Sequence, residues 1–523
     1  MKDGGVIRFI LSAFFIVVLS CIMGGQMAGS GDEQRLGLLF GAILVALAAS
    51  VILGPRVLWL FYVVPWLVNW IPLPRGGGIL QHGGTSWHLV LSPICILMVF
   101  FLWALHRVRL TWIRNWVADL LVFLPIFYLV VVFIRHPAGI ELFGLGGEMT
   151  GGRVVLFAGC GLGWYVFVSV VRIPREKFVR LFRYMFYAWV VGESVCVGLS
   201  LLGLYGGRML QVMDGARDCR FMTLFIVMSV FSLCRYRFWS WKVWVPLCGL
   251  VLATLVSGSR EFIARDGVMV GTFMLLKKEL FPLLLCAALG VGGVYVLAGY
   301  GYTEQAPASL QRIFQLMPGV KISKDVAVGT RGSTSDRVDA WKLALDSRTG
   351  LIRDRLWGDG YARSAKAVSR HSIYSMRHPE LHLTVQTLAL SGDWHNGFIE
   401  TMHRMGLVTV VVVFFFFLYA WISLIRIFYA TAGTELQGYA MVVLNFITTQ
   451  IWFYWFFGET VRFFNAFFYI GFIKILIDYL RSIGQWRPLY SRSIYVPLML
   501  RELPREPILP LQLSRKSVSS KLP

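Results

Sequence analysis

The stretch that decides the fold is LVTVVVVFFFFLYAWISLI, residues 407–425, which contains no charged side chain. A helix needs about 20 apolar residues to cross the hydrocarbon core of a bilayer. Backbone groups in lipid find no water, so they must satisfy their hydrogen bonds within the chain, as a helix does. The stretch therefore predicts a membrane-spanning helix, and similar stretches recur along the chain.

The same criterion predicts fourteen spans. They lie at 6–23, 36–53, 57–71, 87–105, 117–134, 154–171, 184–205, 221–234, 243–257, 266–276, 280–298, 407–425, 438–457 and 463–480. The composition agrees: of 523 residues, 57% are hydrophobic and 15% charged, whereas a soluble protein is about 45–50% apolar and about 25% charged. We predict an all-α polytopic membrane protein, and we exclude a soluble or disordered chain.

The net charge of +22, from 50 Lys and Arg against 28 Asp and Glu, also indicates orientation. The basic residues are scattered between apolar spans, which excludes a nucleic-acid-binding surface. One set of alternate connections is strongly basic, with clusters at 107–114, 172–183, 235–242 and 277–278. The positive-inside rule places this set in the cytoplasm, together with both termini.

The spans divide the chain into five regions. These are an N-terminal bundle (1–242), further helices (243–298), a long outer loop (299–406), C-terminal helices (407–480) and a basic, proline-containing cytoplasmic tail (481–523). A loop this long is usually functional or disordered. Its tryptophans, glycine turns and helical signals favour a folded layer, with a solvated flap as the alternative. In the last span, Lys474 and Asp478 have the i, i+4 spacing of a structural pair.

Three stretches could carry chemistry. The first is Ser257-Gly258-Ser259-Arg260, at the outer end of the ninth span, followed by Arg265. Ser259 and free backbone N–H groups could donate to an anion, and the planar fork of an arginine suits phosphate oxygens. The alternative is an interfacial arginine that reaches toward lipid headgroups.

The second stretch lies in the long loop. Ser333 and Asp336 match a helix-capping pattern, which predicts a helix that starts there and places Arg337, Trp341 and Ala344 on one face. Arg337 would then lie in the first turn, where the helix dipole disfavours a cation unless an anion compensates. The alternative is an ordinary surface helix.

The third stretch ends the long loop and reads Asp393-Trp394-His395-Asn396-Gly397-Phe398-Ile399-Glu400. A histidine titrates near neutral pH, so His395 could act as a general base on a hydroxyl, with Glu400 or Asp393 orienting it. Trp341 and Trp394 could stack on sugar rings. A lone histidine near lipid headgroups is the alternative. The eight cysteines form no C-x-x-C motif, and no metal site is predicted.

Taken in order, these motifs resemble the O-antigen ligase and polymerase superfamily over about residues 243–425. The order is S-G-S-R at a span end, R-x-x-x-W (Arg337 and Trp341), W-G-x-G (357–360) and H-N-x-x-x-E (His395, Asn396 and Glu400). The resemblance implies a GT-C-like architecture in the bacterial inner membrane, with a periplasmic site. It also implies an inverting, metal-independent glycosyltransferase without a cofactor.

The resemblance implies that Arg260 and Arg337 hold a lipid diphosphate and that His395 activates the acceptor hydroxyl. We expect further substrate contacts from Ser259, Arg265, Trp341, Trp394, Asn396 and Glu400. The donor would be an undecaprenyl-diphosphate-linked glycan. The acceptor would be a second such glycan in a polymerase, which we favour, or lipid A-core in a ligase. Further partners would be the bilayer and a chain-length regulator, and the less favoured alternative is a lipid-glycan transporter or flippase.

Overall fold

The computed structural model of the protein describes most of the chain between residues 86 and 486. The described residues are 58, 62, 86–106, 110–137, 151–201, 220–257, 260–306, 311, 314–315, 317–349, 351–361, 394, 396–457 and 460–486. They are predominantly helical and include no strand, which confirms the all-α prediction for this part of the chain. The predicted spans at 6–23 and 36–53, most of the span at 57–71, and the tail beyond 486 lie outside the described residues.

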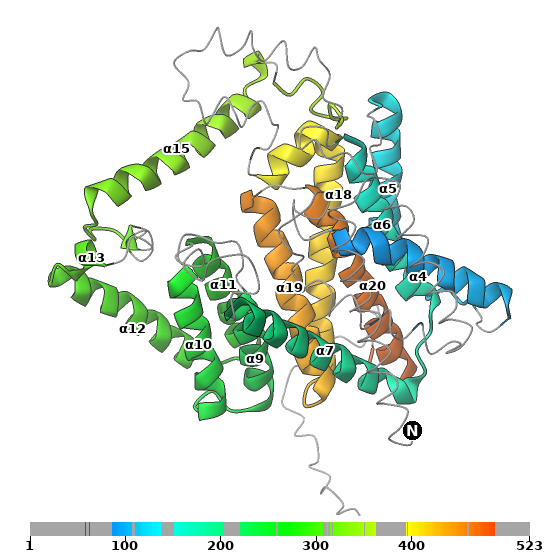
Figure 1. The fold of residues 1–523 in the computed structure, drawn as a ribbon, viewed down its shortest axis with the longest axis horizontal. Helices are drawn as coiled ribbons and strands as arrows, with labels where there is room; N and C mark the ends of the chain where they lie inside the picture. The colour runs from blue at the N-terminus through cyan, green and yellow to red at the C-terminus, as the bar shows by residue number, and fades with distance from the viewer. Residues whose placement is uncertain are drawn as a thin grey trace, which may run out of the picture.

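Each predicted span within the described part coincides with a helix. The helices are α4 (Ser86–Ala104), α5 (Trp116–Arg135), α6 (Gly151–Val170), α7 (Arg175–Leu201), α9 (Arg220–Arg235), α10 (Trp241–Ser257), α11 (Arg260–Leu276), α12 (Leu280–Gly299), α13 (Tyr302–Gln305), α15 (Lys324–Leu345), the 3-10 turn η3 (Ser347–Thr349), α18 (Gly397–Ala430), α19 (Glu435–Phe457) and α20 (Thr460–Ser482). Figure 1 shows α5, α6, α18, α19 and α20 as one bundle, with α9, α10 and α11 beside it and α12 and α13 at the left edge of the molecule.

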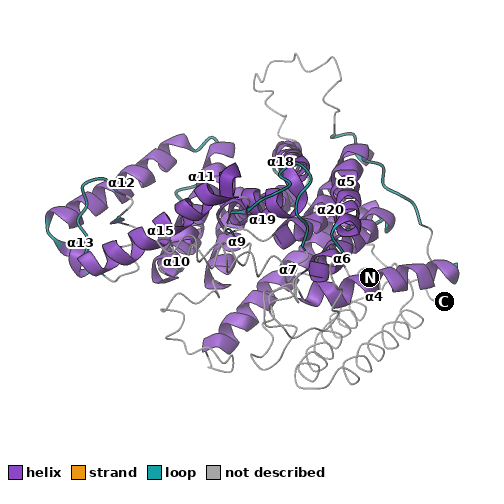
Figure 2. Ribbon diagram, turned by 90° about the horizontal axis from the view of Figure 1, so that it is seen from above, coloured by secondary structure: helices purple, strands orange, loops and turns teal. Residues whose placement is uncertain are grey.

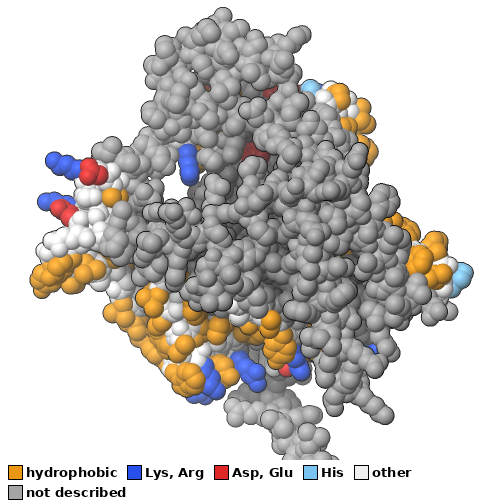
Figure 3. Space-filling model, in the orientation of Figure 1, with side chains coloured by type: hydrophobic (Ala, Val, Ile, Leu, Met, Phe, Trp, Pro, Cys, Tyr) orange, Lys and Arg blue, Asp and Glu red, His pale blue; other side chains and the backbone are white. Residues whose placement is uncertain are grey.

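Three of these helices, α5, α12 and α18, are long and apolar enough to cross a membrane. Nearly the whole surface of α12 is exposed, including Leu280, Phe281 and Leu284. Figure 3 shows hydrophobic side chains gathered over this edge, and Figure 2 shows that α12 and α13 also stand at the periphery when seen from above. Such a surface is stable in a bilayer, whereas water would disfavour it.

Helix α20 is the centre of the packing. It packs against α6, α18 and α19, and most of its described side chains between Phe463 and Leu480 are buried. Aromatic rings fill the contacts: Phe463 meets Phe416 of α18 with ring centroids 4.8 Å apart, and Phe468 meets Trp164 of α6 at 5.5 Å. A helix buried on nearly all sides belongs to the interior of its bundle.

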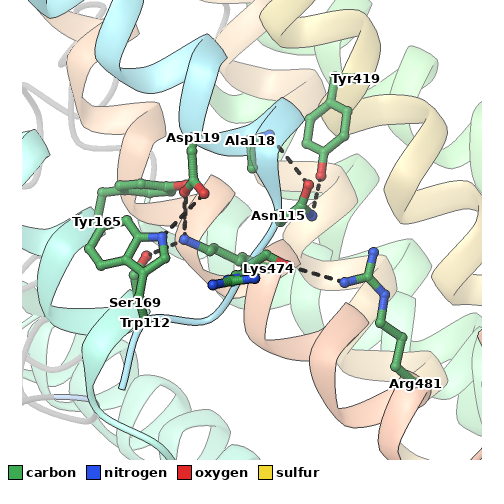
Figure 4. A network of polar contacts seen from close by, with 10 residues as sticks. Trp112, Asn115, Ala118, Asp119, Tyr165, Ser169, Tyr419, Lys474 and Arg481 are labelled. Carbon is green, nitrogen blue, oxygen red and sulfur yellow. Dashed lines mark hydrogen bonds and ion pairs between the residues drawn. The ribbon is translucent and has the colours of Figure 1, made fainter. Parts of the chain in front are cut away.

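A lysine side chain lies fully inside this bundle. Lys474 of α20 has no exposed surface, and its ammonium lies 2.6 Å from the carboxylate of Asp119 on α5. The ammonium also donates to Ser169, at 3.0 Å, and to Tyr165, at 3.3 Å. The indole ring of Trp112 covers it at 4.2 Å (Figure 4). Polar groups from α5 and α6, together with the ring of Trp112, therefore replace the water that the ammonium has lost.

The predicted pairing of Lys474 with Asp478 along α20 is wrong. An i, i+4 pair forms on an exposed helix face, whereas Lys474 points into the bundle. A buried ammonium needs a carboxylate that is desolvated with it, and Asp119 meets this need. The first turn of α5, where Asp119 lies, also favours an acid because of the helix dipole.

Helix α5 is held at both of its ends. Before its first turn, Asn115 donates to the hydroxyl of Tyr419 on α18 at 2.7 Å (Figure 4). At its other end, Arg135 forms an ion pair with Asp354 at 2.9 Å. The chain after η3, which contains Asp354, is thereby attached to the far end of the same helix that carries Asp119.

We predict that Lys474→Met lowers the free energy of unfolding by about 1–3 kcal/mol, because Asp119, whose side chain is 21% exposed, keeps a partly buried charge without its partner. The double variant Asp119→Asn/Lys474→Met should recover much of the loss. The control is Arg183→Leu, which removes an ion pair with Glu435 whose side chains are 45% and 49% exposed and should cost about 0–1 kcal/mol. Thermal unfolding in detergent measures all three. Equal losses in Lys474→Met and Arg183→Leu would contradict the prediction.

Candidate functional site

Three segments that are far apart in the sequence meet at the end of the bundle where α18 begins. They are the C-terminal part of α15, the turn at 351–361, and the chain from Trp394 to Gly406 (Figure 1). Their apolar side chains form one cluster. Its buried members are Ala340, Ala344, Ile352, Trp394, Ile399, Met402 and Val410. The W-G-x-G motif and the described residues Asn396 and Glu400 of the H-N-x-x-x-E motif thus belong to one folded unit.

The long loop contains more helix than its capping pattern indicates. The prediction that a helix begins at Ser333 is wrong, because α15 already begins at Lys324, after Ser323. Arg337 therefore lies in the middle of α15, and the expected conflict with the helix dipole does not arise. A capping pattern marks a possible start, but it does not end a helix that began upstream. Trp341 and Ala344 do share a face of α15, and Ala344 is fully buried there.

The start of α15 is attached to α13 and to the residues that follow it. Gln311 donates to the carbonyls of Glu304, at 2.9 Å, and Ala306, at 2.7 Å, and it accepts from the N–H of Ser323 at 2.8 Å. Thr303 donates to the carbonyl of Lys321 at 2.8 Å. Helix α15 is thus anchored to α13 at one end and packed on the start of α18 at the other.

The W-G-D-G turn, which is the turn at 351–361 with the motif at 357–360, supplies backbone hydrogen bonds that are missing in α18. Gly406, with φ of 80° and ψ of 168°, interrupts this helix. In an uninterrupted helix the N–H of Leu407 would donate to the carbonyl of His403. Here Leu407 donates to the carbonyl of Arg355 at 2.8 Å, and His403 accepts from the N–H of Asp359 at 2.7 Å. The turn thus supplies the partners that the kink removes.

Glycines allow this contact because both backbones approach closely. Gly358 and Gly406 have φ of +83° and +80°, a region that disfavours other residues. A Cβ on Gly358 would lie 2.6 Å from the carbonyl oxygen of Arg404, and a Cβ on Gly406 would collide with the carbonyl of Leu356. The turn and the kink therefore fit only with glycine at these positions.

The end of α5 supports the other side of the turn. Tyr128 donates to the carbonyl of Trp357 at 3.1 Å, and the two rings stack with centroids 6.0 Å apart. Burial raises the pKa of Asp354, but the N–H of Trp357 and the guanidinium of Arg135 lower it by more, so the pKa lies below its usual value. Asp354 therefore remains ionised, and paired with Arg135, at neutral pH.

A chain of polar contacts runs through Trp394. Its carbonyl accepts from the indole N–H of Trp341 at 2.6 Å, and its own indole N–H donates to Nδ1 of His403 at 3.1 Å. Nε2 of His403 lies 3.7 Å from the carboxylate of Asp359. The two carboxylate oxygens of Asp359 in turn accept backbone N–H groups of the turn, at 2.9 and 3.0 Å.

The first turn of α18 is held by its own cap and by α19. Asn396 is the N-cap, and its side-chain oxygen accepts from the N–H of Ile399 at 3.2 Å. Tyr454 of α19 donates to the hydroxyl of Thr401 at 2.7 Å. Gly397 leaves room for the Tyr454 ring, since an added Cβ would lie 2.7 Å from a ring carbon. Residues on both sides of position 395 therefore have defined positions.

The other predicted site residues are distributed as follows. Ser259 and His395 lie outside the described residues. Arg260 is the first residue of α11 and Arg265 lies in its second turn, and the side chains of both lie outside the described part. Arg337, Trp341, Asn396 and Glu400 are half-buried. Trp394 is fully buried, so in this conformation its ring has no surface that could stack on a sugar.

Three further residues contribute to the site without a separate prediction. His403 and Arg404 precede the kink, and Tyr128 lies on α5. Arg404 is 9% exposed, and its guanidinium lies 5.7 Å from the centre of the Tyr361 ring. Their residue types are common in interfacial helices, so the sequence contains no signal that distinguishes them.

No protein-family profile matches the sequence, and no curated protein is significantly similar to it. The chemistry of the site therefore rests on its own residues and geometry. Among the described residues, no group of three or more His, Cys, Asp or Glu side chains could hold a metal ion.

We predict that Gly406→Ala loosens the turn from α18 because the new Cβ collides with the carbonyl of Leu356. In detergent, trypsin should then cleave after Arg353 and Arg355 several-fold faster than in the wild type. The control is Gly319→Ala, at φ of +77° with open space around it, which carries backbone strain of about 1–3 kcal/mol without a collision. Equal cleavage after Arg353 and Arg355 in both variants would contradict the steric explanation.

Proposed function

We propose that this protein is a polytopic membrane glycosyltransferase that acts on undecaprenyl-diphosphate-linked glycans, as a polymerase in the first instance. The observation that carries the proposal is the convergence of α15, the W-G-D-G turn and the start of α18 around Trp394. These are three of the four motifs whose order resembles the O-antigen ligase and polymerase superfamily. A chance set of short motifs would have no reason to meet in one folded unit.

The arrangement of the helix ends supports a membrane orientation with the site on the periplasmic side. Arg481 donates to the carbonyl of Arg114 at 3.2 Å, which joins two connections that the positive-inside rule places in the cytoplasm. Arg135 and Asp354 pair at the opposite end of α5, where the rule places the outside. Fourteen spans, a GT-C-like arrangement and cytoplasmic termini are part of the proposal.

The proposed chemistry needs positive charge near the leaving diphosphate. Arg260 opens α11, where free backbone N–H groups and the helix dipole also favour an anion. Arg337 lies one turn before Trp341 on α15. Two guanidinium groups in surroundings of low dielectric would stabilise the charge that develops as the bond to the anomeric carbon breaks.

The attacking hydroxyl needs a base on the opposite face of the sugar. His395 takes this role in the proposal: it accepts the hydroxyl proton as the new glycosidic bond forms. Attack opposite the departing diphosphate inverts the anomeric centre. Because the donor bond supplies the energy, no nucleotide is consumed. Trp394 does not contact the sugar in this proposal, because its ring is buried. It joins α15 to α18 through its hydrogen bonds with Trp341 and His403.

We predict that Arg260→Ala, Arg337→Ala and His395→Ala each lower glycan assembly about 100-fold or more, the range expected for a lost base or a lost oxyanion donor. The assay is complementation of a deletion strain, with the glycan profiled on gels and the protein level followed by immunoblot. The matched control is Lys342→Ala, a cation on the same helix as Arg337 whose side chain is 72% exposed. It should assemble glycan as the wild type does.

The results of this assay test the catalytic roles of the three residues and distinguish a polymerase from a ligase. Glycan ladders of wild-type length in all three variants, at equal protein levels, would exclude the catalytic roles. In the deletion strain, accumulation of lipid-linked glycan with a single repeat indicates a polymerase. Accumulation of full-length lipid-linked glycan that never reaches lipid A-core indicates a ligase.

A further inference from the structure

We infer that His403 is a positioning residue: it holds the indole of Trp394, the residue that precedes His395 in the chain. The inference rests on the proposed role of His395 as the base. His403 itself is poorly placed to touch a substrate, since its side chain is only 16% exposed. Its nitrogens face Trp394 on one side and Asp359 on the other.

The hydrogen bond from Trp394 determines which nitrogen of His403 carries a proton. Nδ1 accepts from an indole N–H, which can only donate, so Nδ1 is unprotonated. A neutral imidazole then carries its proton on Nε2, and this N–H faces the carboxylate of Asp359 at 3.7 Å. The carboxylate favours this tautomer, and the tautomer keeps Nδ1 available for Trp394.

Asp359 is rigid, so it can orient the histidine. Its carboxylate accepts the N–H groups of Arg353 and Asp354, and its own N–H donates to the carbonyl of His403. The W-G-D-G turn therefore holds the backbone of His403 by a hydrogen bond and places a carboxylate 3.7 Å from its side chain. Asp359 of the motif thus links the turn to the start of α18.

Trp394 transmits this position to its neighbour in the chain. Its indole is held by His403 and its carbonyl by Trp341, so α18 and α15 both fix the residue that precedes His395. Asn396, which follows, is fixed as the N-cap of α18. A displacement of about 1 Å in a catalytic group can cost about 100-fold in rate, so these contacts matter for the base.

The test compares variants that remove one donor or acceptor with variants that keep it. Trp394→Phe removes the indole N–H, and His403→Leu removes the acceptor. His403→Asn retains an acceptor oxygen near the position of Nδ1 and is the rescue variant. Trp421→Phe is the matched control, because it removes an indole hydrogen bond of α18 to Thr448, at 3.3 Å, remote from position 395.

Two readouts are combined. The full-length protein in detergent is treated with diethylpyrocarbonate across about pH 5 to 8, the range in which histidine titrates, and modification of His395 is followed by mass spectrometry. Glycan assembly is measured in the complemented deletion strain. The exposed His106 serves as the internal reference for reagent reactivity. The chemical readout needs no substrate, so it is independent of the proposed reaction.

We expect Trp394→Phe and His403→Leu to shift the pH midpoint or the rate of His395 modification several-fold and to lower glycan assembly about 10- to 100-fold. The double variant should be no worse than the worse single variant, because both remove the same hydrogen bond. His403→Asn and Trp421→Phe should resemble the wild type. Should His403→Leu fail to accumulate, His403→Phe, which keeps a ring but also lacks the acceptor, replaces it with the same expected shift.

The outcomes separate this inference from the proposed function. Wild-type behaviour of His395 in both Trp394→Phe and His403→Leu overturns the inference, and the proposed function still stands if His395→Ala is inactive. Equal losses in His403→Asn and His403→Leu also overturn it, because packing alone would then explain the effect. Full activity of His395→Ala overturns the proposed function, whatever the chemical modification shows.

Discussion

The contact between Lys474 and Asp119 constrains the position of α5, the helix that holds the turn at 351–361. A lysine without exposed surface must find its carboxylate inside the bundle, because an unpaired buried charge costs several kcal/mol. This requirement fixes α20 relative to α5, and Tyr165 and Ser169 add α6 to the same junction. The pair thus specifies which helices are neighbours, whereas apolar contacts alone would tolerate several arrangements.

Helix α5 carries that constraint from one end of the bundle to the other. Its first turn contains Asp119, and its last turns contain Tyr128 and Arg135, which hold the turn at 351–361. This segment also supplies the backbone hydrogen bonds that α18 lacks at Gly406. The kink, the turn and the helix end are therefore mutually dependent, and the chain around Trp394 takes its position from all three.

Local signals predicted some of these features well and others poorly. The helices that coincide with predicted spans follow from apolar runs of suitable length, because such runs in lipid have few alternatives to a helix. The start of α15 did not follow from Ser333 and Asp336, since a capping pattern says nothing about the helix that precedes it. The W-G-x-G motif located the turn, but its contact with the kink depends on two glycines separated by more than forty residues.

The amino-acid sequence by itself determined the helical class, the boundaries of most helices and the order of the motifs, because apolar run length and local spacing act within a few turns of chain. Only the tertiary structure decided which side chains pair across the bundle. Lys474 pairs with Asp119 across 355 residues, and Trp394 is enclosed by residues from α15 and α18. Burial decides such pairings, since it sets the cost of leaving a charge or an N–H without a partner, and which groups are buried is known only when the helices have packed.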